Sequence, residues 1–248
     1  MSLDTDHSIP LYQQLKEEIK TSITSGDIKP GQKIPTETEL SEQYKVSRIT
    51  VRRAIEELCQ EKFLIKKQGK GTFVQHQKIQ RKIAHLLSFS DACEANGMVP
   101  SSSVTQKSII YMDHQLALEM NCREGEQAIY IQRLRMADGA PIMCENNYFS
   151  YENFSFLLDE PLTDSLYDLL KEKYGITVST SRDSYIDVVR SSGDLSRVLQ
   201  ITNGEPLFFL HTKMYDTNDR LVHVGKQYII SERYRFYLDD TYNNSDAE

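Results

Sequence analysis

Apolar residues recur every fourth position near the start of the chain, which is the spacing of one face of a helix. This stripe consists of Leu11, Leu15, Ile19 and Ile23. Gly26 and the turn at 29–31 then end the helical pattern. The sequence therefore predicts a first helix with a single buried face.

Two shorter helices are expected next. Thr36 can cap the first of them, and Glu39 three residues later completes a capping box. Ser47 is a natural N-cap for the second helix. Four apolar residues of that helix share one face at helical spacing: Val51, Ala54, Ile55 and Leu58.

With that apolar face turned inward, the first turn of the third helix presents arginine and hydroxyl side chains to solvent. Arg48 and Arg52 lie on or beside the open face, with Thr50 between them. Arginine can reach guanine edges in a major groove, and serine or threonine can bond phosphate. This helix is therefore a candidate DNA-recognition helix.

A basic hairpin is expected directly after these helices. Residues 64–67 and 72–74 are typical of two short strands, and the turn between them contains Gly69 and Gly71. Glycine permits positive φ and close approach of backbone, while Lys66, Lys67 and Lys70 supply charge for phosphates. The order of cap, arginine turn and wing favours a winged helix-turn-helix at 1–76 over a solvated helical hairpin with ordinary surface lysines. The expected DNA contacts are Thr36, Ser47, Arg48, Thr50, Arg52, Lys66, Lys67, Gly69 and Lys70.

A polar, basic stretch without periodicity, at 77–84, is expected to be a linker to a second domain at 85–248. In that domain one pattern occurs twice, about eighty residues apart: helix, Gly-Glu, strand, turn, strand. The first copy spans 113–149 and the second 194–230, with a helix at 162–174 and a strand at 177–190 between them. The pattern predicts an α+β domain, an antiparallel sheet of two related halves with a ligand cleft between them.

Charge is distributed unevenly over the 248 residues, whose formal net charge is −7. Residues 1–82 hold 15 Lys and Arg against 11 Asp and Glu, a net of +4, and the remainder holds 14 against 25, a net of −11. A DNA-binding surface is therefore expected only in the N-terminal third.

One strand face of the second domain ends in two arginines. Ile129, Ile131, Arg133 and Arg135 alternate along it, so the face should be turned inward. Buried guanidinium groups need anionic partners, and a phosphate or carboxylate ligand would supply one. Internal acids such as Glu145 or Asp187 are the alternative.

At its N-terminal motifs the chain closely resembles the GntR family of bacterial transcription regulators. The matching residues are Pro35-Thr36-Glu37, 46–52 and 69–74, while Phe63 departs from the family's usual glycine. The second domain resembles the UTRA effector domain of the HutC subfamily, whose fold is chorismate-lyase-like. Its matches are 87–90, 97–100, Arg133-Leu134-Arg135, Asp138-Gly139, Ser165-Leu166-Tyr167 and Arg233-Tyr234.

The resemblance implies a repressor that binds a palindromic double-stranded operator as a homodimer. It also implies a small anionic effector, a phosphorylated sugar or related compound. The family's effector-binding positions correspond here to Phe89, Ser90, Arg133, Arg135, Glu145, Ser165, Tyr167, His223 and Tyr228. The final strand departs from the family pattern, with His223, Ile229 and Ile230 where amino-sugar-phosphate regulators carry Glu, Tyr and Arg.

Other classes of function find less support in the sequence. The four cysteines and six histidines show no metal-ligand spacing, so neither a metal nor a cofactor is expected. With no long apolar run and no signal peptide, the protein is expected in the cytoplasm, away from membranes. One alternative is a chorismate-lyase-like enzyme domain fused to the DNA-binding head, but the sequence shows no nucleophile–base pair and no paired acids. Another is an architectural DNA-binding protein without a ligand, which would not need the arginine face.

Overall fold

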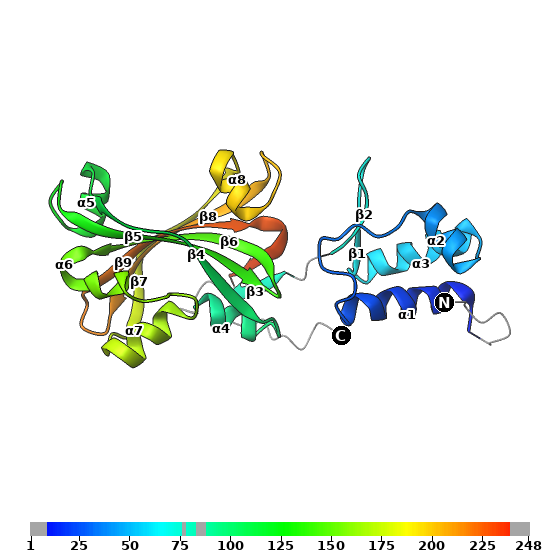
Figure 1. Ribbon diagram of the computed structural model, residues 1–248, viewed down its shortest axis with the longest axis horizontal. Coiled ribbons are helices and arrows are strands. Elements are labelled where there is room, and N and C mark those ends of the chain that lie inside the picture. Colours follow the sequence, from blue (N-terminus) through cyan, green and yellow to red (C-terminus); the bar gives the residue numbers. More distant parts are fainter. Residues whose placement is uncertain (1–8, 76–77, 83–87, 239–248) are drawn as a thin grey trace. The chain divides into compact units, whose positions relative to one another are not determined.

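The computed structural model describes residues 9–75, 78–82 and 88–238 (Figure 1). The chain divides into two compact units, Met1–Gln77 and Lys78–Glu248. Each has its own apolar core.

The first unit has the expected three helices and a hairpin: α1 (Leu11–Thr24), α2 (Glu37–Tyr44), α3 (Arg48–Gln60), β1 (Leu64–Lys67) and β2 (Gly71–Val74). The predicted apolar faces of α1 and α3 pack into one core, in which Leu15, Val51 and Leu58 are fully buried. The hairpin is antiparallel, with Leu64 opposite Val74.

Local hydrogen bonds explain where α2 and α3 begin. Thr36 Oγ1 accepts from the Glu39 N–H at 3.3 Å, and Glu39 Oε2 accepts from the Thr36 N–H at 2.7 Å, which completes the predicted capping box. Ser47 Oγ accepts from the Thr50 N–H at 3.1 Å. Before the wing the left-handed backbone conformation falls on Lys62 (φ 63°), so Phe63 is free to pack against the core.

The second unit is built on one antiparallel sheet in the order β4-β5-β6-β9-β8-β7 (Figure 1). Its strands are β4 (Pro100–Tyr111), β5 (Gln127–Ala137), β6 (Ala140–Ser150), β7 (Val178–Arg190), β8 (Pro206–Asp216) and β9 (Leu221–Ile230). Its helices are α4 (Phe89–Glu94), α5 (His114–Met120), α6 (Tyr151–Phe154), η1 (Ser155–Leu158), α7 (Leu166–Tyr174), α8 (Gly193–Leu199) and η2 (Ser231–Arg233).

The predicted repeat is present, and it is larger than expected. Each half consists of strand, helix, strand, strand: β4-α5-β5-β6 and β7-α8-β8-β9, which meet where β6 pairs with β9. Strand β4 was not predicted, because its outer part, Ser101-Ser102-Ser103, has no apolar alternation.

The helices divide between the two faces of the sheet (Figure 1). Helices α5 and α8 cover one face, where Ala117 and Leu199 join separate apolar clusters. Helices α4, α6 and α7 cover the opposite face, where Phe89 packs with Met143, and Leu170 shares a cluster with Ile131.

The expected linker at 77–84 is partly wrong. Ile79–Lys82 form β3, which pairs in parallel with β10 (Tyr234–Tyr237) inside the second unit. Ile79 and Tyr234 are both buried, and this anchors a stretch whose other side chains are polar. Residues 77, 83 and 84 of the expected linker lie outside the described residues.

Candidate functional site

The two arginines of α3 that are predicted to contact DNA differ in their surroundings. Arg48 is exposed and forms no ion pair with any described residue, and its neighbour Ile49 is 79% exposed. Arg52 donates from Nε (3.2 Å) and Nη2 (3.0 Å) to Glu37 Oε2 on α2. Arg48 is thus available to contact a base edge, whereas Arg52 would first have to break its ion pair with Glu37.

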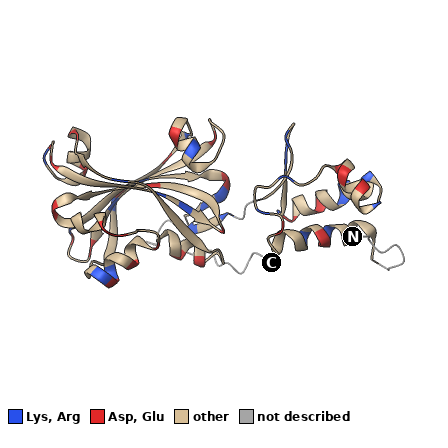
Figure 2. Cartoon of the chain, viewed as in Figure 1, with Lys and Arg blue, Asp and Glu red and all other residues tan. Residues whose placement is uncertain are grey.

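The wing places its lysines on a turn that requires glycine. Gly69 has φ 70° and Gly71 has φ 119°, and a Cβ on Gly71 would lie 2.5 Å from Cε of Lys33. Lys70 is exposed at the tip, and the wing carries a concentration of positive charge (Figure 2). Sequence reasoning missed Lys33, which precedes the helix-turn-helix and is brought to the wing by a bridge to Phe73.

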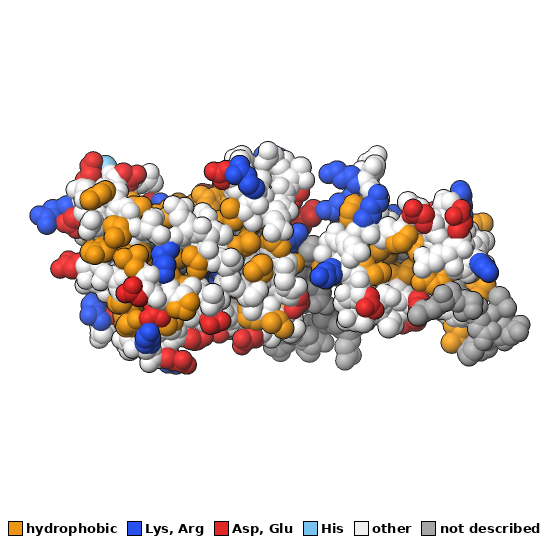
Figure 3. All heavy atoms as spheres, in the orientation of Figure 1, with side chains coloured by type: hydrophobic (Ala, Val, Ile, Leu, Met, Phe, Trp, Pro, Cys, Tyr) orange, Lys and Arg blue, Asp and Glu red, His pale blue; other side chains and the backbone are white. Residues whose placement is uncertain are grey.

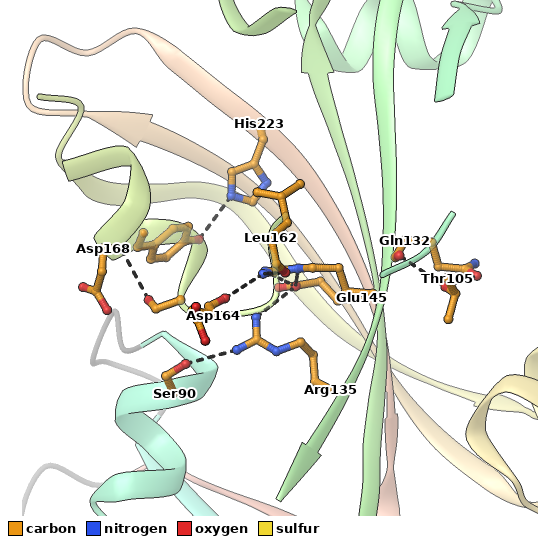
Figure 4. Close-up of polar contacts among 12 residues, drawn as sticks. Ser90, Thr105, Gln132, Arg135, Glu145, Leu162, Asp164, Asp168 and His223 are labelled. Carbon is orange, nitrogen blue, oxygen red and sulfur yellow. Dashed lines mark hydrogen bonds and ion pairs between the residues drawn. The ribbon is translucent and has the colours of Figure 1, made fainter. Parts of the chain in front are cut away.

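In the second unit, a cavity of about 410 Å³ is lined by residues of the sheet and by the first residues of α4 and α7. Six of the nine residues predicted to bind an effector line this cavity: Phe89, Arg133, Arg135, Glu145, Ser165 and Tyr167. Two others touch this group: Ser90 Oγ accepts from Arg135 Nη2 at 3.1 Å, and His223 Nε2 lies 3.2 Å from the Tyr167 hydroxyl (Figure 4).

Glu145 pairs with both arginines. Arg133 donates from Nε (3.0 Å) and Nη2 (2.5 Å) to its Oε2, and Arg135 Nη1 lies 3.5 Å away (Figure 4). Burial alone would raise the pKa of Glu145, but the two guanidinium charges outweigh it and hold the pKa at about 2. Of the two candidate internal acids, Glu145 is therefore the one that neutralises the arginine charge. Asp187 is exposed on β7.

The two arginines differ in the donors they have left. Arg133 also donates from Nη1 to the carbonyl oxygen of Asp164 at 3.1 Å, so it ties β5 to the segment before α7 (Figure 4). Arg135 is 2% exposed, and its Nε has no hydrogen-bond partner among the described residues. Burial lowers the pKa of Arg135 to about 10, with a smaller contribution from the charge of Arg133. Arg135 thus has the donor capacity to bind an incoming anion.

The N-terminus of α7 opens onto the same cavity. Ser165 caps this nine-residue helix by accepting from the Asp168 N–H at 3.3 Å, and Leu166 and Tyr167 line the cavity beside it. Exposed N–H groups at a helix N-terminus favour negative charge.

His223 is buried at 1% exposure and packs against Phe149 in a tilted arrangement, with ring centroids 5.2 Å apart. Burial lowers its pKa to about 4, although Glu145 nearby acts in the opposite direction. The imidazole is therefore neutral at pH 7. Burial also raises the pKa of Tyr167, which stays a neutral hydroxyl.

The expectation for Tyr228 is wrong. Its side chain lies on the opposite face of the sheet, among the α8 cluster and 5.1 Å from the Phe209 ring, centroid to centroid. The reason is the strand period of two: on β9, Gln227 is opposite Glu145 and faces the cavity, so Tyr228 must face away.

Several further polar residues of the cavity were missed by sequence reasoning, among them Arg81, Thr212 and Gln227. Arg81 stood in the expected linker. Thr212 on β8 and Gln227 on β9 could have been found only from strand alternation, which places Thr212 on the same face as Leu210 and Gln227 on the same face as His223.

Within the described ranges, no group of three or more His, Cys, Asp or Glu is placed to hold a metal ion. No helix among these residues is long and apolar enough to cross a membrane.

Comparison with known proteins agrees with this architecture. Residues 11–74 match the gntR family of bacterial regulatory proteins, and residues 95–235 match the UTRA domain. The chain is 31% identical to the uncharacterized HTH-type transcriptional regulator YurK of Bacillus subtilis, over 97% of this chain and 99% of that protein. It is 28% identical to the HTH-type transcriptional repressor NagR of Bacillus subtilis, over 96% and 99% of the two chains.

Among solved structures, PhnF from Mycobacterium smegmatis has the same fold, with a TM-score of 0.66 at 21% identity over 94% of this chain and 100% of that one. The relatives are regulators, which sets the enzyme alternative aside. The winged helix-turn-helix, the sheet built from two repeats and the matched family models all lead to the same conclusion. The chain belongs to the GntR family of bacterial transcription regulators and carries a UTRA effector domain of the HutC type.

Proposed function

We propose that this protein is a repressor that binds a palindromic operator as a homodimer and is controlled by a small anionic metabolite. The observation that carries the effector proposal is a cationic cavity in an acidic unit (Figure 3 shows acidic side chains spread over one face of that unit). Residues 78–248 contain 17 Lys and Arg against 25 Asp and Glu, yet the described residues lining the cavity include Arg81, Arg133 and Arg135 against one acid, Glu145. Such an inversion of charge suits an anion.

A phosphorylated sugar or a related compound suits the cavity. Its volume of about 410 Å³ is that of a small-molecule site. The names of similar chains also support a sugar-related effector. In Escherichia coli, one is a probable repressor of the fructoselysine utilization operon, and another is a repressor of mannosyl-D-glycerate transport and metabolism.

The proposal also requires two copies of the chain. One winged head contacts few base pairs, and two heads increase both affinity and site length. We place self-association on the second unit, on the sheet face between α5 and α8. Partly exposed aromatic side chains lie there, such as Tyr130 and Tyr148, whose ring centroids are 5.2 Å apart. Because operator DNA is the partner, the site of action is the cytoplasm of a bacterium.

The effector proposal is tested by titrating operator DNA with the wild type and with Arg135→Gln, across inorganic phosphate and a panel of phosphorylated sugars. Arg135 is preferred to Arg133, because Arg133 holds Glu145 and Asp164 in place. We expect Arg135→Gln to keep operator affinity without ligand and to lose the response to anions. Arg123→Gln, which removes an arginine that is 91% exposed, is the control. A normal response in Arg135→Gln would move the anion site elsewhere.

The reading head is tested by two substitutions with different expected effects. Arg48→Ala should cost about 1–3 kcal/mol of binding and reduce sequence preference, because a base contact is lost. Lys70→Ala should weaken all DNA equally and lower the salt slope by about one per subunit. A selective loss for Lys70 with a uniform loss for Arg48 would reverse the two roles.

The interface is tested with a fragment of residues 1–77, which contains the whole first unit and its core. Sedimentation should show a monomer that binds operator weakly. A fragment that dimerises and binds as tightly as the full chain would place the interface in the head.

A further inference from the structure

The most exposed large apolar side chain among the described residues of the first unit belongs to Ile49, in the first turn of α3. It is 79% exposed, against 45% for Ile9 and 37% for Ile65. It takes no part in the apolar core of the unit. Its neighbours in the chain, Arg48 and Thr50, are both predicted to contact DNA. Ile49 thus lies within the surface that is expected to meet the operator.

The packing of α3 gives no reason for an apolar residue at position 49. The buried face of this helix is formed by Val51, Ala54, Ile55 and Leu58. Successive residues of an α-helix are rotated by about 100°, so Ile49 points almost directly away from the middle of that face. A helix position of this kind is ordinarily filled by a polar or charged residue. Isoleucine there indicates a contact with another molecule.

The long side chains one turn further along α3 do not cover Ile49, because each is held by another helix. Arg52 donates from Nη2 to Glu37 Oε2 of α2 at 3.0 Å. Arg53 lies over the Tyr12 ring of α1, with its guanidinium carbon 3.7 Å from the ring centroid, and donates to the Tyr12 hydroxyl at 3.0 Å. The apolar side chain therefore remains open between two arginines that are turned to different neighbours.

The chemistry of isoleucine decides which base it can select. In a major groove, the C5-methyl group of thymine is the apolar group that the base edges present, and the other positions are hydrogen-bond donors or acceptors. Isoleucine has neither a donor nor an acceptor. It therefore gains from contact with this methyl group, and it is penalised wherever it removes water from a polar base edge. Arg48, beside it, suits guanine instead.

We propose that Ile49 is a specificity-determining residue, which selects thymine at one position of each operator half-site through its C5-methyl group. Adjacent residues rise about 1.5 Å along a helix, and stacked base pairs are about 3.4 Å apart. This thymine therefore lies within roughly two base pairs of the base that Arg48 contacts. Ile49 carries no charge, so it adds sequence preference without adding a phosphate contact. The inference rests on the proposed operator recognition by α3.

The test uses the full-length protein and a duplex that the wild type selects from a random library. Each thymine of one half-site is replaced in turn by deoxyuridine, which lacks only the methyl group, and affinity is measured by fluorescence anisotropy. We expect one replacement to weaken wild-type binding about fourfold, as burial of one methyl group predicts. In Ile49→Ala the same replacement should have no effect, and the salt slope should stay that of the wild type. Ile49→Val should retain part of the deoxyuridine penalty.

Ile109→Ala is the matched control, because it removes the same side chain from β4 of the second unit, where Ile109 is 43% exposed. It should keep the full deoxyuridine penalty. A selected half-site without thymine, or a wild type indifferent to every replacement, would overturn the inference. A penalty that persists in Ile49→Ala would overturn it too and assign the methyl contact to another side chain. A selection that enriches no sequence would instead refute operator recognition itself, so the two failures are distinguishable.

Discussion

The two halves of the effector sheet share one scaffold and differ in chemistry. The register between β6 and β9 relates Glu145 to Gly225, because Glu145 pairs with Gln227 and Asn147 pairs with Gly225. In the same way Arg133, the partner of Glu145, corresponds to Thr212, the partner of Gly225. A buried ion pair in the first half is thus replaced by a hydroxyl and a glycine in the second.

This difference shows how the two copies of a duplicated fold can come to differ in charge while they share one scaffold. The first half supplies charge and satisfies much of it internally through Glu145. At the corresponding positions the second half has no charged side chain. The strand order and register are common to both halves, while a few side chains decide how much charge each half buries.

The largest expected effect on stability comes from removing the carboxylate of Glu145 in the first half. Glu145→Gln leaves two buried guanidinium groups without their carboxylate, and should lower stability by about 3–5 kcal/mol. The symmetry-related change Gly225→Ala removes no charge and should cost less. Urea unfolding followed by circular dichroism at pH 7 measures both. An equal cost for the two variants would break the contrast between the halves.

The next effect is a pH dependence specific to the second half, where His223 occupies the position of Met143 in the first. The folded-state pKa of His223 is about 4, below its ordinary 6.5, so the unfolded chain binds the proton more readily. Stability is therefore fully present above about pH 6.5 and falls as the pH drops toward about 4, by about 2–3 kcal/mol.

His223→Met installs the residue of the first half and should remove this slope. His114→Gln is the control, because the His114 side chain is 76% exposed, and it should keep the wild-type slope. Urea midpoints measured between pH 7 and pH 4 would show both. A slope that persists in His223→Met would assign the pH dependence to other groups.

The smallest effect concerns the turns that join the last two strands of each half. In the first half Gly139 has φ 74°, and a Cβ added there would meet nothing within 4 Å, so Gly139→Ala should cost about 1 kcal/mol for conformation alone. In the second half Asp219 already has φ 63° and pairs with Arg182. Asp219→Gly should therefore change stability less, since relief of the backbone is offset by the lost pair. Thermal melting would compare them, and a larger loss in Asp219→Gly would reverse the ranking.

Sequence reasoning succeeded where a local signal is strong. The caps at Thr36 and Ser47 fixed two helix starts, and the alternation of Arg133 and Arg135 placed both on the buried face of β5. It failed where the decisive contact is distant in the chain. Strand β3 is defined by pairing with β10, and Arg81 reaches the cavity only because of that pairing.

The same limit applies to the second half of the sheet. Thr212 and Gly225 look like ordinary strand residues, and only the strand register shows that they occupy the positions of Arg133 and Glu145. Tyr228 illustrates the converse, because a shift of one residue along β9 moves a side chain to the other face.

The parallel pairing of β3 with β10 also orders events on the ribosome. Ile79 and Tyr234 are in register but 155 residues apart in the chain, so β3 waits for its partner while almost all of the second unit is made. At bacterial rates of synthesis that interval is roughly 8–30 s. The first unit has its own core and needs nothing made later in order to fold. A nascent or prematurely terminated chain would therefore display a folded DNA-binding head before any effector could act on it.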